Sequence, residues 1–322
     1  MEKLKFAFYW AASCGGCEIA VLDMNEKILD VVAMADIVFW PVALDYKYKD
    51  VEAMPDKSID VCFFNGAIRT EENEHMAKLL RQKAKILLAF GSCAHEGCIP
   101  GLANISNRKE IFEKVYKETA STRNPEFTTP QTTLRVREGE LRLPEFYDTV
   151  KTLDQTVDVD YYLPGCPPPV KLIAKAVEAI AKNELPPRGS VLAPEKSVCD
   201  ECPRKRENKK ISEIKRVYEI TPDTEKCLLE QGVICMGPAT RAGCEAQCIS
   251  VNMPCTGCGG PCPNVLEQGA AMMSALSSIL GARDEKKETY DAEKMIAQVK
   301  DPLGTFYRYS LPHSILRRKV MK

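Results

Sequence analysis

Nine of the 15 cysteines in this chain fall within one stretch of 64 residues, from Cys199 to Cys262. The stretch is also rich in Gly and Pro and lacks the apolar periodicity of strands or helices, so it cannot build a conventional hydrophobic core. A disulfide framework explains the thiols poorly, because their number is odd and because we expect the protein in the reducing cytoplasm. We therefore expect bound metal to help specify the fold of this part of the chain.

The first 190 residues have a different pattern, in which short apolar runs alternate with amphipathic segments. Strands are predicted at residues 4–10, 37–42, 58–64, 85–90 and 157–163, and the clearest helices at 71–83 and 170–183. Such alternation predicts an α/β fold, a flavodoxin-like doubly wound parallel sheet. We assign residues 1–190 to this domain and residues 191–322 to an irregular Cys-rich domain with few helices. An insertion carries a predicted helix (108–119) and hairpin (134–143).

Three predicted strands of the first domain end at cysteines, each beside Gly or Pro. Cys14 and Cys17 lie in Ser-Cys-Gly-Gly-Cys-Glu, Cys93 in Gly-Ser-Cys-Ala and Cys166 in Pro-Gly-Cys-Pro-Pro. Because the carboxyl ends of parallel strands meet at one edge of a sheet, we expect these four thiols to converge. Four thiolates suit either a [4Fe–4S] cluster or a zinc ion.

In this order, the three motifs resemble those of the small subunit of [NiFe] hydrogenases, and the related complex I subunit shares part of the set. The resemblance implies that Cys14, Cys17, Cys93 and Cys166 hold the proximal [4Fe–4S] cluster. It also implies a separate large subunit that carries the nickel–iron site, so the present chain is expected to contain no catalytic residue of its own.

The second half extends the resemblance to two further clusters, and hence to three [4Fe–4S] clusters in all. The implied distal ligands are Cys199, Cys202, Cys227 and Cys235. The implied medial ligands are Cys244, Cys248, Cys255 and Cys258, with Cys262 as the alternative fourth ligand to Cys248. Two cysteines remain unassigned by the pattern. We expect Cys62 to be a small core residue, since it lies in an apolar strand, and Cys98 to be an unligated thiol.

The run Met-Gly-Pro-Ala-Thr-Arg-Ala-Gly after Cys235 resembles the cytoplasmic group 3 branch of these hydrogenases, in particular the methyl-viologen-reducing type of methanogens. The resemblance implies an oxidoreductase subunit that relays electrons from H2 oxidation at the large subunit. The implied acceptors are an iron–sulfur subunit and, beyond it, heterodisulfide reductase.

Two other functions stay open at this stage. The first is the cluster-bearing subunit of a complex I-like or membrane-bound hydrogenase, and the second is a non-redox binding module stapled by zinc. Iron and acid-labile sulfide analysis separates them from the main hypothesis.

The remaining features restrict partners more than they identify them. The formal net charge of -1 gives no basic excess for a nucleic acid, and no apolar run reaches the roughly 18 residues that a membrane helix needs. We expect His75 and His313 to be surface residues, the basic C-terminal end to be a solvated tail, and His95 to be structural or solvated. The sequence assigns no role to Glu18, which follows Cys17 directly.

Overall fold

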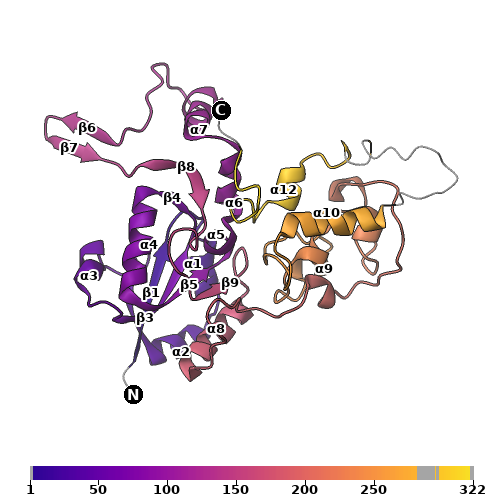
Figure 1. Cartoon of the computed structure of the whole chain (residues 1–322), viewed down its shortest axis with the longest axis horizontal. Coiled ribbons are helices and arrows are strands. Elements are labelled where there is room, and N and C mark those ends of the chain that lie inside the picture. Colours follow the sequence, from indigo (N-terminus) through magenta and orange to yellow (C-terminus); the bar gives the residue numbers. More distant parts are fainter. Residues whose placement is uncertain (1–2, 281–293, 295–296, 320–322) are drawn as a thin grey trace.

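The computed structural model describes residues 3–280, 294 and 297–319 of the chain. Within them, five parallel strands form one sheet in the order β2-β1-β3-β5-β9 (Figure 1). The strands are β1 (Leu4–Trp10), β2 (Ala35–Phe39), β3 (Ile59–Asn65), β5 (Ala84–Phe90) and β9 (Tyr161–Leu163). Counted among themselves, they have the order 2-1-3-4-5 of flavodoxin-like folds. The predicted α/β class is confirmed.

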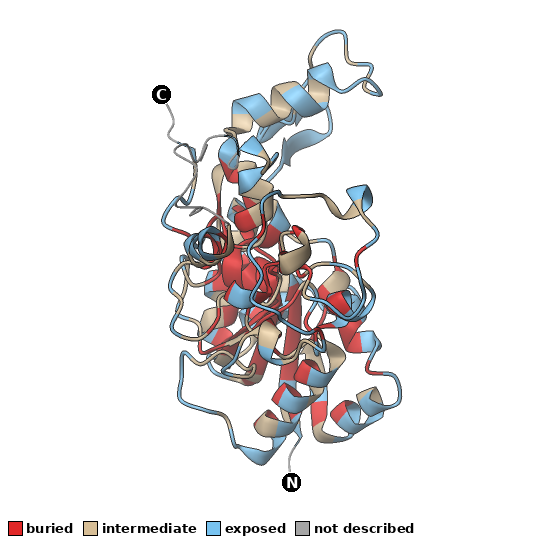
Figure 2. Cartoon of the chain, turned by 90° about the vertical axis from the view of Figure 1, so that its right-hand side faces the viewer, coloured by how far each residue is buried: buried red, intermediate tan, exposed pale blue. Residues whose placement is uncertain are grey.

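Helices cover both faces of this sheet because successive side chains of each strand point to opposite sides. Phe6, Phe8 and Phe63 are buried on one face, where the rings of Phe8 and Phe63 stack with centroids 4.8 Å apart. Tyr9 and Phe64 are buried on the other face. The first face is covered by α1 (Gly16–Leu22), α2 (Lys27–Met34) and α8 (Val170–Lys182), and the second by α3 (Tyr48–Ala53) and α4 (Glu71–Lys83). Figure 2 shows the buried residues gathered along the central strands.

The insertion contains the predicted helix and hairpin, but it is attached to the rest of the protein by a strand pair that was not predicted. The predicted helix is α7 (Arg108–Glu113) followed by a π-helical turn, η2 (Lys114–Glu118), and the hairpin consists of β6 (Thr133–Val136) and β7 (Gly139–Arg142). The hairpin projects away from the sheet (Figure 1). Sequence reasoning missed the pairing of β4 (Ile68–Thr70) with β8 (Phe146–Lys151), which ties the insertion to the body of the protein.

Two other predicted elements have different bounds. The strand predicted at 37–42 is β2, at residues 35–39, and the strand predicted at 157–163 forms sheet pairs only at its last three residues. Short helices follow β5 at the cysteine-bearing edge. They are α5 (Ser92–Glu96), α6 (Cys98–Gly101) and the 3-10 turn η1 (Leu102–Ile105).

The Cys-rich part of the chain consists mainly of turns in its described residues, as predicted. The expectation that it cannot build a hydrophobic core is wrong, because Val233, Met272 and Leu276 belong to a buried apolar cluster that is completed by side chains of the C-terminal residues. Its helices are α9 (Gln247–Ser250), α10 (Gln268–Ile279) and α12 (Pro302–Phe306), and its 3-10 turns are η3 (Val198–Asp200), η4 (Val217–Glu219), η5 (Leu229–Gln231) and η6 (Gly237–Ala239). No helix in the described ranges combines the length and apolar character needed to cross a membrane.

The C-terminal segment, residues 306–319, packs back against both parts of the chain. Phe306, Tyr307 and Leu311 are buried, and the Tyr309 carbonyl accepts a hydrogen bond of 2.9 Å from the backbone N–H of Cys98. These apolar side chains are buried against residues that are distant in the sequence. The segment is therefore part of the folded protein.

The basic end of this segment agrees with the sequence prediction only in its exposure. Arg317 and Lys319 are exposed, as expected. The prediction of a solvated tail is nevertheless wrong, because the backbone N–H of Lys319 donates to the Asn104 carbonyl at 2.8 Å and Arg318 donates to the Thr149 hydroxyl. The end of the described chain is therefore fixed against the body of the protein.

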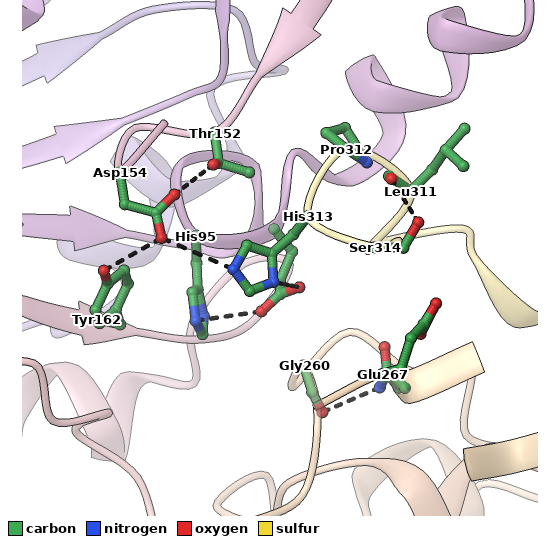
Figure 3. Close-up of polar contacts among 12 residues, drawn as sticks. His95, Thr152, Asp154, Tyr162, Gly260, Glu267, Leu311, Pro312, His313 and Ser314 are labelled. Carbon is green, nitrogen blue, oxygen red and sulfur yellow. Dashed lines mark hydrogen bonds and ion pairs between the residues drawn. The ribbon is translucent and has the colours of Figure 1, made fainter. Parts of the chain in front are cut away.

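A buried carboxylate fixes this segment electrostatically (Figure 3). Glu96 is 1% exposed; its Oε1 lies 3.2 Å from Nε2 of His95, and its Oε2 lies 3.4 Å from Nδ1 of His313. His313 Nε2 is also 3.8 Å from Asp154 Oδ2. The hydrogen bond to Glu96, and then its charge, raise the pKa of His313 to about 9, whereas burial lowers the pKa of His95. His313 reaches the surface, as predicted, but it is also the counter-ion of Glu96, which the sequence did not indicate.

This ion pair predicts a pH-dependent stability. The folded pKa of His313 lies above its unfolded value of about 6.5, so the stabilisation is complete below that pH and is lost as the pH rises through 9. Because the His313 side chain is 38% exposed, we expect only about 1 kcal/mol after solvent screening. His313→Gln should lower the thermal midpoint at pH 6 and have little effect at pH 10. The matched control is His75→Gln, on the exposed face of α4. Equal differences at both pH values would contradict the assignment.

Candidate metal centres

The structure brings four cysteines together at the carboxyl edge of the sheet, as predicted. Cys14 precedes α1, Cys17 lies in it, Cys93 lies in α5 after β5, and Cys166 follows β9. We call these the sheet-edge thiols. Burial raises the pKa of Cys17, and the neighbouring thiols Cys93, Cys166 and Cys14 raise it further. Cys17 and Cys93 are buried, whereas Cys14 is exposed at the surface.

Two glycines at this edge leave no room for a side chain. Gly91 has a φ of +86°, and a Cβ added there would lie 2.4 Å from the Sγ of Cys17. Gly165 has a φ of +130°, and its Cβ would lie 2.5 Å from the backbone of Pro168. These two positions need glycine for both conformation and space, which explains why Gly accompanies the thiols in the sequence motifs.

A fifth thiol, Cys98, also lies at this edge, which the sequence pattern did not predict. Its Sγ donates a hydrogen bond to the Sγ of Cys166 at a distance of 3.6 Å. Cys62, by contrast, lies in β3 and is fully buried in the sheet core, which confirms the prediction for that residue.

Four further thiols line a cavity of about 520 Å³ in the Cys-rich part. We call them the outer thiols: Cys199, Cys202, Cys227 and Cys235. Burial raises the pKa of Cys199 to about 12. The backbone N–H of Cys255 donates to the Sγ of Cys235 at 3.3 Å. A Cβ on Gly237 would lie 3.1 Å from the Sγ of Cys199, so the backbone at Gly237 packs closely against this thiol.

Four more thiols line a cavity of about 550 Å³ between the sheet edge and the outer thiols, and Cys166 of the sheet edge lines it as well. We call them the middle thiols: Cys244, Cys248, Cys255 and Cys258. Burial raises the pKa of Cys258 to about 12, and hydrogen bonds from the backbone of Ala246 and Gln247 partly offset the raised pKa of Cys244.

Cys262 itself lines neither cavity, although Pro238 beside it lines the outer one and Arg241 lines the middle one. Its Sγ donates to the carbonyl of Pro238 at 3.4 Å, and the charged groups that act on its thiol are Arg241 and Asp200 rather than another cysteine. The sequence left the fourth medial ligand open between Cys248 and Cys262. In the structure these two thiols have different surroundings, since Cys248 lines the middle cavity and Cys262 donates to the Pro238 carbonyl.

The middle thiols contact both other sets. On one side, the Ser92 hydroxyl donates to the Cys258 carbonyl at 2.5 Å, and the backbone of Cys166 hydrogen-bonds the Cys258 thiol. On the other side, Cys255 contacts Cys235 through the hydrogen bond described above. The three sets therefore form one continuous series, in which the middle thiols lie between the sheet edge and the outer cavity.

Two buried polar side chains, Glu18 and His95, lie near the sheet-edge thiols. Glu18 is 4% exposed and accepts hydrogen bonds from the Trp40 indole and, at 3.4 Å, from the Asn65 amide. Burial raises the pKa of Glu18, and these two donors offset part of the rise. His95 is buried against the Tyr162 ring, with centroids 4.6 Å apart, which agrees with a structural role. His75 is exposed on α4, as predicted.

The donor chemistry fits an iron–sulfur cluster in each set. All-thiolate ligation selects soft metals, either zinc or iron–sulfur clusters. Four thiolates around zinc, each about 2.3 Å from the metal, close tightly on one ion. The outer and middle thiols instead line cavities large enough for more than one ion.

Comparison with known proteins places the chain in a family. Residues 14–180 match the family described as NADH ubiquinone oxidoreductase, 20 Kd subunit. The chain is 44% identical to the iron-sulfur subunit of the F420-non-reducing hydrogenase of Archaeoglobus profundus, over 99% of each chain. It is 38% identical to the corresponding subunit of the F420-non-reducing hydrogenase of Methanothermobacter thermautotrophicus, over 100% of this chain and 98% of that one.

Solved structures support the same fold. A chain of an NAD+-reducing [NiFe]-hydrogenase aligns with a TM-score of 0.50 and 25% identity, covering 57% of this chain and 94% of that one. A chain of the [NiFeSe]-hydrogenase of Dm. baculatum aligns with a TM-score of 0.50 at 15% identity, covering 81% and 95%. The chain therefore belongs to the NADH ubiquinone oxidoreductase 20 kDa subunit family and, within it, to the iron–sulfur subunits of F420-non-reducing hydrogenases.

Proposed function

We propose that this hydrogenase subunit relays electrons, released by H2 oxidation at the large subunit, through three [4Fe–4S] clusters to an acceptor subunit. The observation that carries the proposal is the continuous series of thiols. The middle set contacts the sheet edge through Cys258 and the outer set through Cys255. A relay needs its centres close together, and here their ligands touch.

Each thiol set corresponds to one cluster in the proposal. The sheet-edge thiols hold the proximal cluster, the middle thiols the medial cluster and the outer thiols the distal cluster. Cys248 is the fourth medial ligand because it lines the same cavity as Cys244, Cys255 and Cys258, whereas Cys262 lines neither cavity and donates to the Pro238 carbonyl. An iron–sulfur cluster supplies one-electron chemistry when bound, at a potential set by its surroundings.

The chain's own groups stabilise the thiolate form of the ligands. The backbone N–H groups of Gly237 and Cys255 donate to Cys235, and those of Ala246 and Gln247 donate to Cys244. Hydrogen bonds to a thiolate spread its negative charge and favour the reduced state of a bound cluster. The chain therefore tunes the potential at the outer and middle centres through backbone N–H groups.

The large subunit is expected to cover the sheet edge. Cys14 is exposed there, and Trp10, Ile19 and Leu22 are exposed apolar side chains on the same strand end and helix. Exposed apolar groups beside a metal ligand favour burial against a partner chain. The nickel–iron site belongs to that partner in our proposal. The cytoplasmic location, the acceptor iron–sulfur subunit and heterodisulfide reductase stay predictions from the resemblance.

Two features favour this role over a complex I-like one. The family match ends at residue 180, before the outer and middle thiols, whereas the hydrogenase relatives align over almost their entire length.

We further propose a domain boundary near residue 190, since the paired strands of the sheet lie before it and the outer and middle thiols after it.

Metal analysis of the native complex, purified without oxygen, tests the proposal. We expect about 12 iron atoms and as much acid-labile sulfide in this chain, together with a nickel-containing partner. Zinc without sulfide would contradict the relay and support a zinc-stapled binding module. Iron without a nickel partner would favour the complex I-like function.

The medial assignment predicts different effects for two substitutions. Cys248→Ser should remove the medial cluster and lower the iron content by about four atoms, because the variant loses a thiolate ligand. The matched variant Cys262→Ser should keep its iron, since the Cys262 thiol lines neither cavity and donates to the Pro238 carbonyl. Loss of iron in Cys262→Ser alone would show that Cys262 is the ligand.

The close packing at the sheet edge gives a second prediction. Gly91→Ala would place a Cβ 2.4 Å from the Cys17 Sγ, so the variant should lose the proximal cluster, about four iron atoms. Gly189→Ala is the matched control, because Gly189 also has a φ of +86° but has nothing within 4 Å of its added Cβ. Both variants should lose about 1 kcal/mol from backbone strain, and only Gly91→Ala should lose iron. Equal iron contents would contradict the packing argument.

A further inference from the structure

The proposed relay leaves one thiol at the sheet edge without a role. Cys98 is fully buried, and its Sγ donates to the Sγ of Cys166 at 3.6 Å. Cys93 is a second hydrogen-bonding neighbour of the same thiol. Five thiols therefore meet where a four-iron cluster needs four.

The Cys98 thiol is held in place by a strained backbone and by the C-terminal segment. Its φ is +45°, an uncommon value for a residue with a side chain, and Gly97 before it has a φ of +87°. The backbone N–H of Cys98 donates to the Tyr309 carbonyl at 2.9 Å. Pro312 packs against Gly97 and Gly101 so closely that a Cβ at either glycine would lie 2.3 Å from its Cγ (Figure 3 shows the segment around Pro312). Strain of this kind persists only where surrounding contacts impose it.

The contact between the Sγ atoms of Cys98 and Cys166 indicates that one thiol is a cluster ligand and the other a hydrogen-bond donor. The four thiolates of a [4Fe–4S] cluster bind four different iron atoms at the corners of a cube and point away from one another. Two of them therefore do not lie in hydrogen-bonding contact. Since Cys98 and Cys166 do, only one of the pair binds iron. Cys166 lies in the turn after β9 and also contacts the middle thiols, whereas Cys98 lies behind it, against the C-terminal segment.

We propose that Cys98 is a positioning residue whose S–H hydrogen-bonds the Cys166 thiolate and raises the reduction potential of the proximal cluster. The inference rests on the proposed function, since it assigns the cluster to the sheet-edge thiols. The physical reason is that a donor to a ligand sulfur stabilises the additional negative charge of the reduced cluster more than it stabilises the oxidised cluster. The C-terminal segment fixes the direction of that donor.

Redox titration of the complete hydrogenase complex, followed by electron paramagnetic resonance of the proximal cluster, tests the proposal. The variants are Cys98→Ala, which removes the donor, and Cys98→Ser, which keeps a donor proton. Cys62→Ala is the matched control, because Cys62 is a buried thiol in the sheet core, away from the cluster ligands. Iron content is measured for each variant. Should Cys98→Ala not assemble, Cys98→Gly replaces it, since glycine accepts the positive φ.

We expect Cys98→Ala to keep its full iron content and to shift the proximal potential to more negative values. Cys98→Ser should return it toward the wild-type value, and Cys62→Ala should leave it unchanged. Loss of about four iron atoms in Cys98→Ala would show that Cys98 is a ligand and overturn the proposal, and so would an unshifted potential. Absence of iron in the wild-type complex would instead overturn the proposed function itself.

Discussion

Parallel pairing of β1, β3, β5 and β9 is the constraint on which the rest of the structure depends. Because these strands run in the same direction, the loops that follow three of them meet at one edge and deliver four thiols from segments up to 152 residues apart in the sequence, Cys14 to Cys166. The same edge then receives the Cys-rich part, through the contact of Ser92 with Cys258. A sheet of mixed direction would separate these thiols.

Contacts between the two parts of the chain stabilise this arrangement as well as linking the thiol sets. Glu96 is buried at their junction, where an unpaired carboxylate would be costly, and His313 from the C-terminal segment supplies the opposite charge. The same segment supplies Tyr309 and Pro312 behind Cys98. One stretch of chain therefore neutralises a buried charge and orients a thiol at the first centre of the proposed relay.

Much of the fold follows from local sequence patterns, but the long-range contacts do not. Apolar runs and helical periodicity predicted α4 and three of the five strands of the sheet, β1, β3 and β5, with close to their observed bounds, and Gly and Pro beside Cys14, Cys93 and Cys166 indicated a shared edge. The pairing of His313 depends on Glu96, which lies 217 residues earlier, and no local pattern connects the two. The thiol contact of Cys98 depends on the positive φ and on Tyr309, which the cysteine spacing does not reveal.

Anomalous X-ray diffraction at the iron edge, from crystals of the complex grown without oxygen, tests the central claim most directly, because it locates iron relative to each thiol. We expect three separate iron peaks within this chain, at the sheet-edge, middle and outer thiols in that order, with the middle peak between Cys258 and Cys255. A missing middle peak, or one bound by Cys262 in place of Cys248, would contradict a continuous relay with the ligands assigned here.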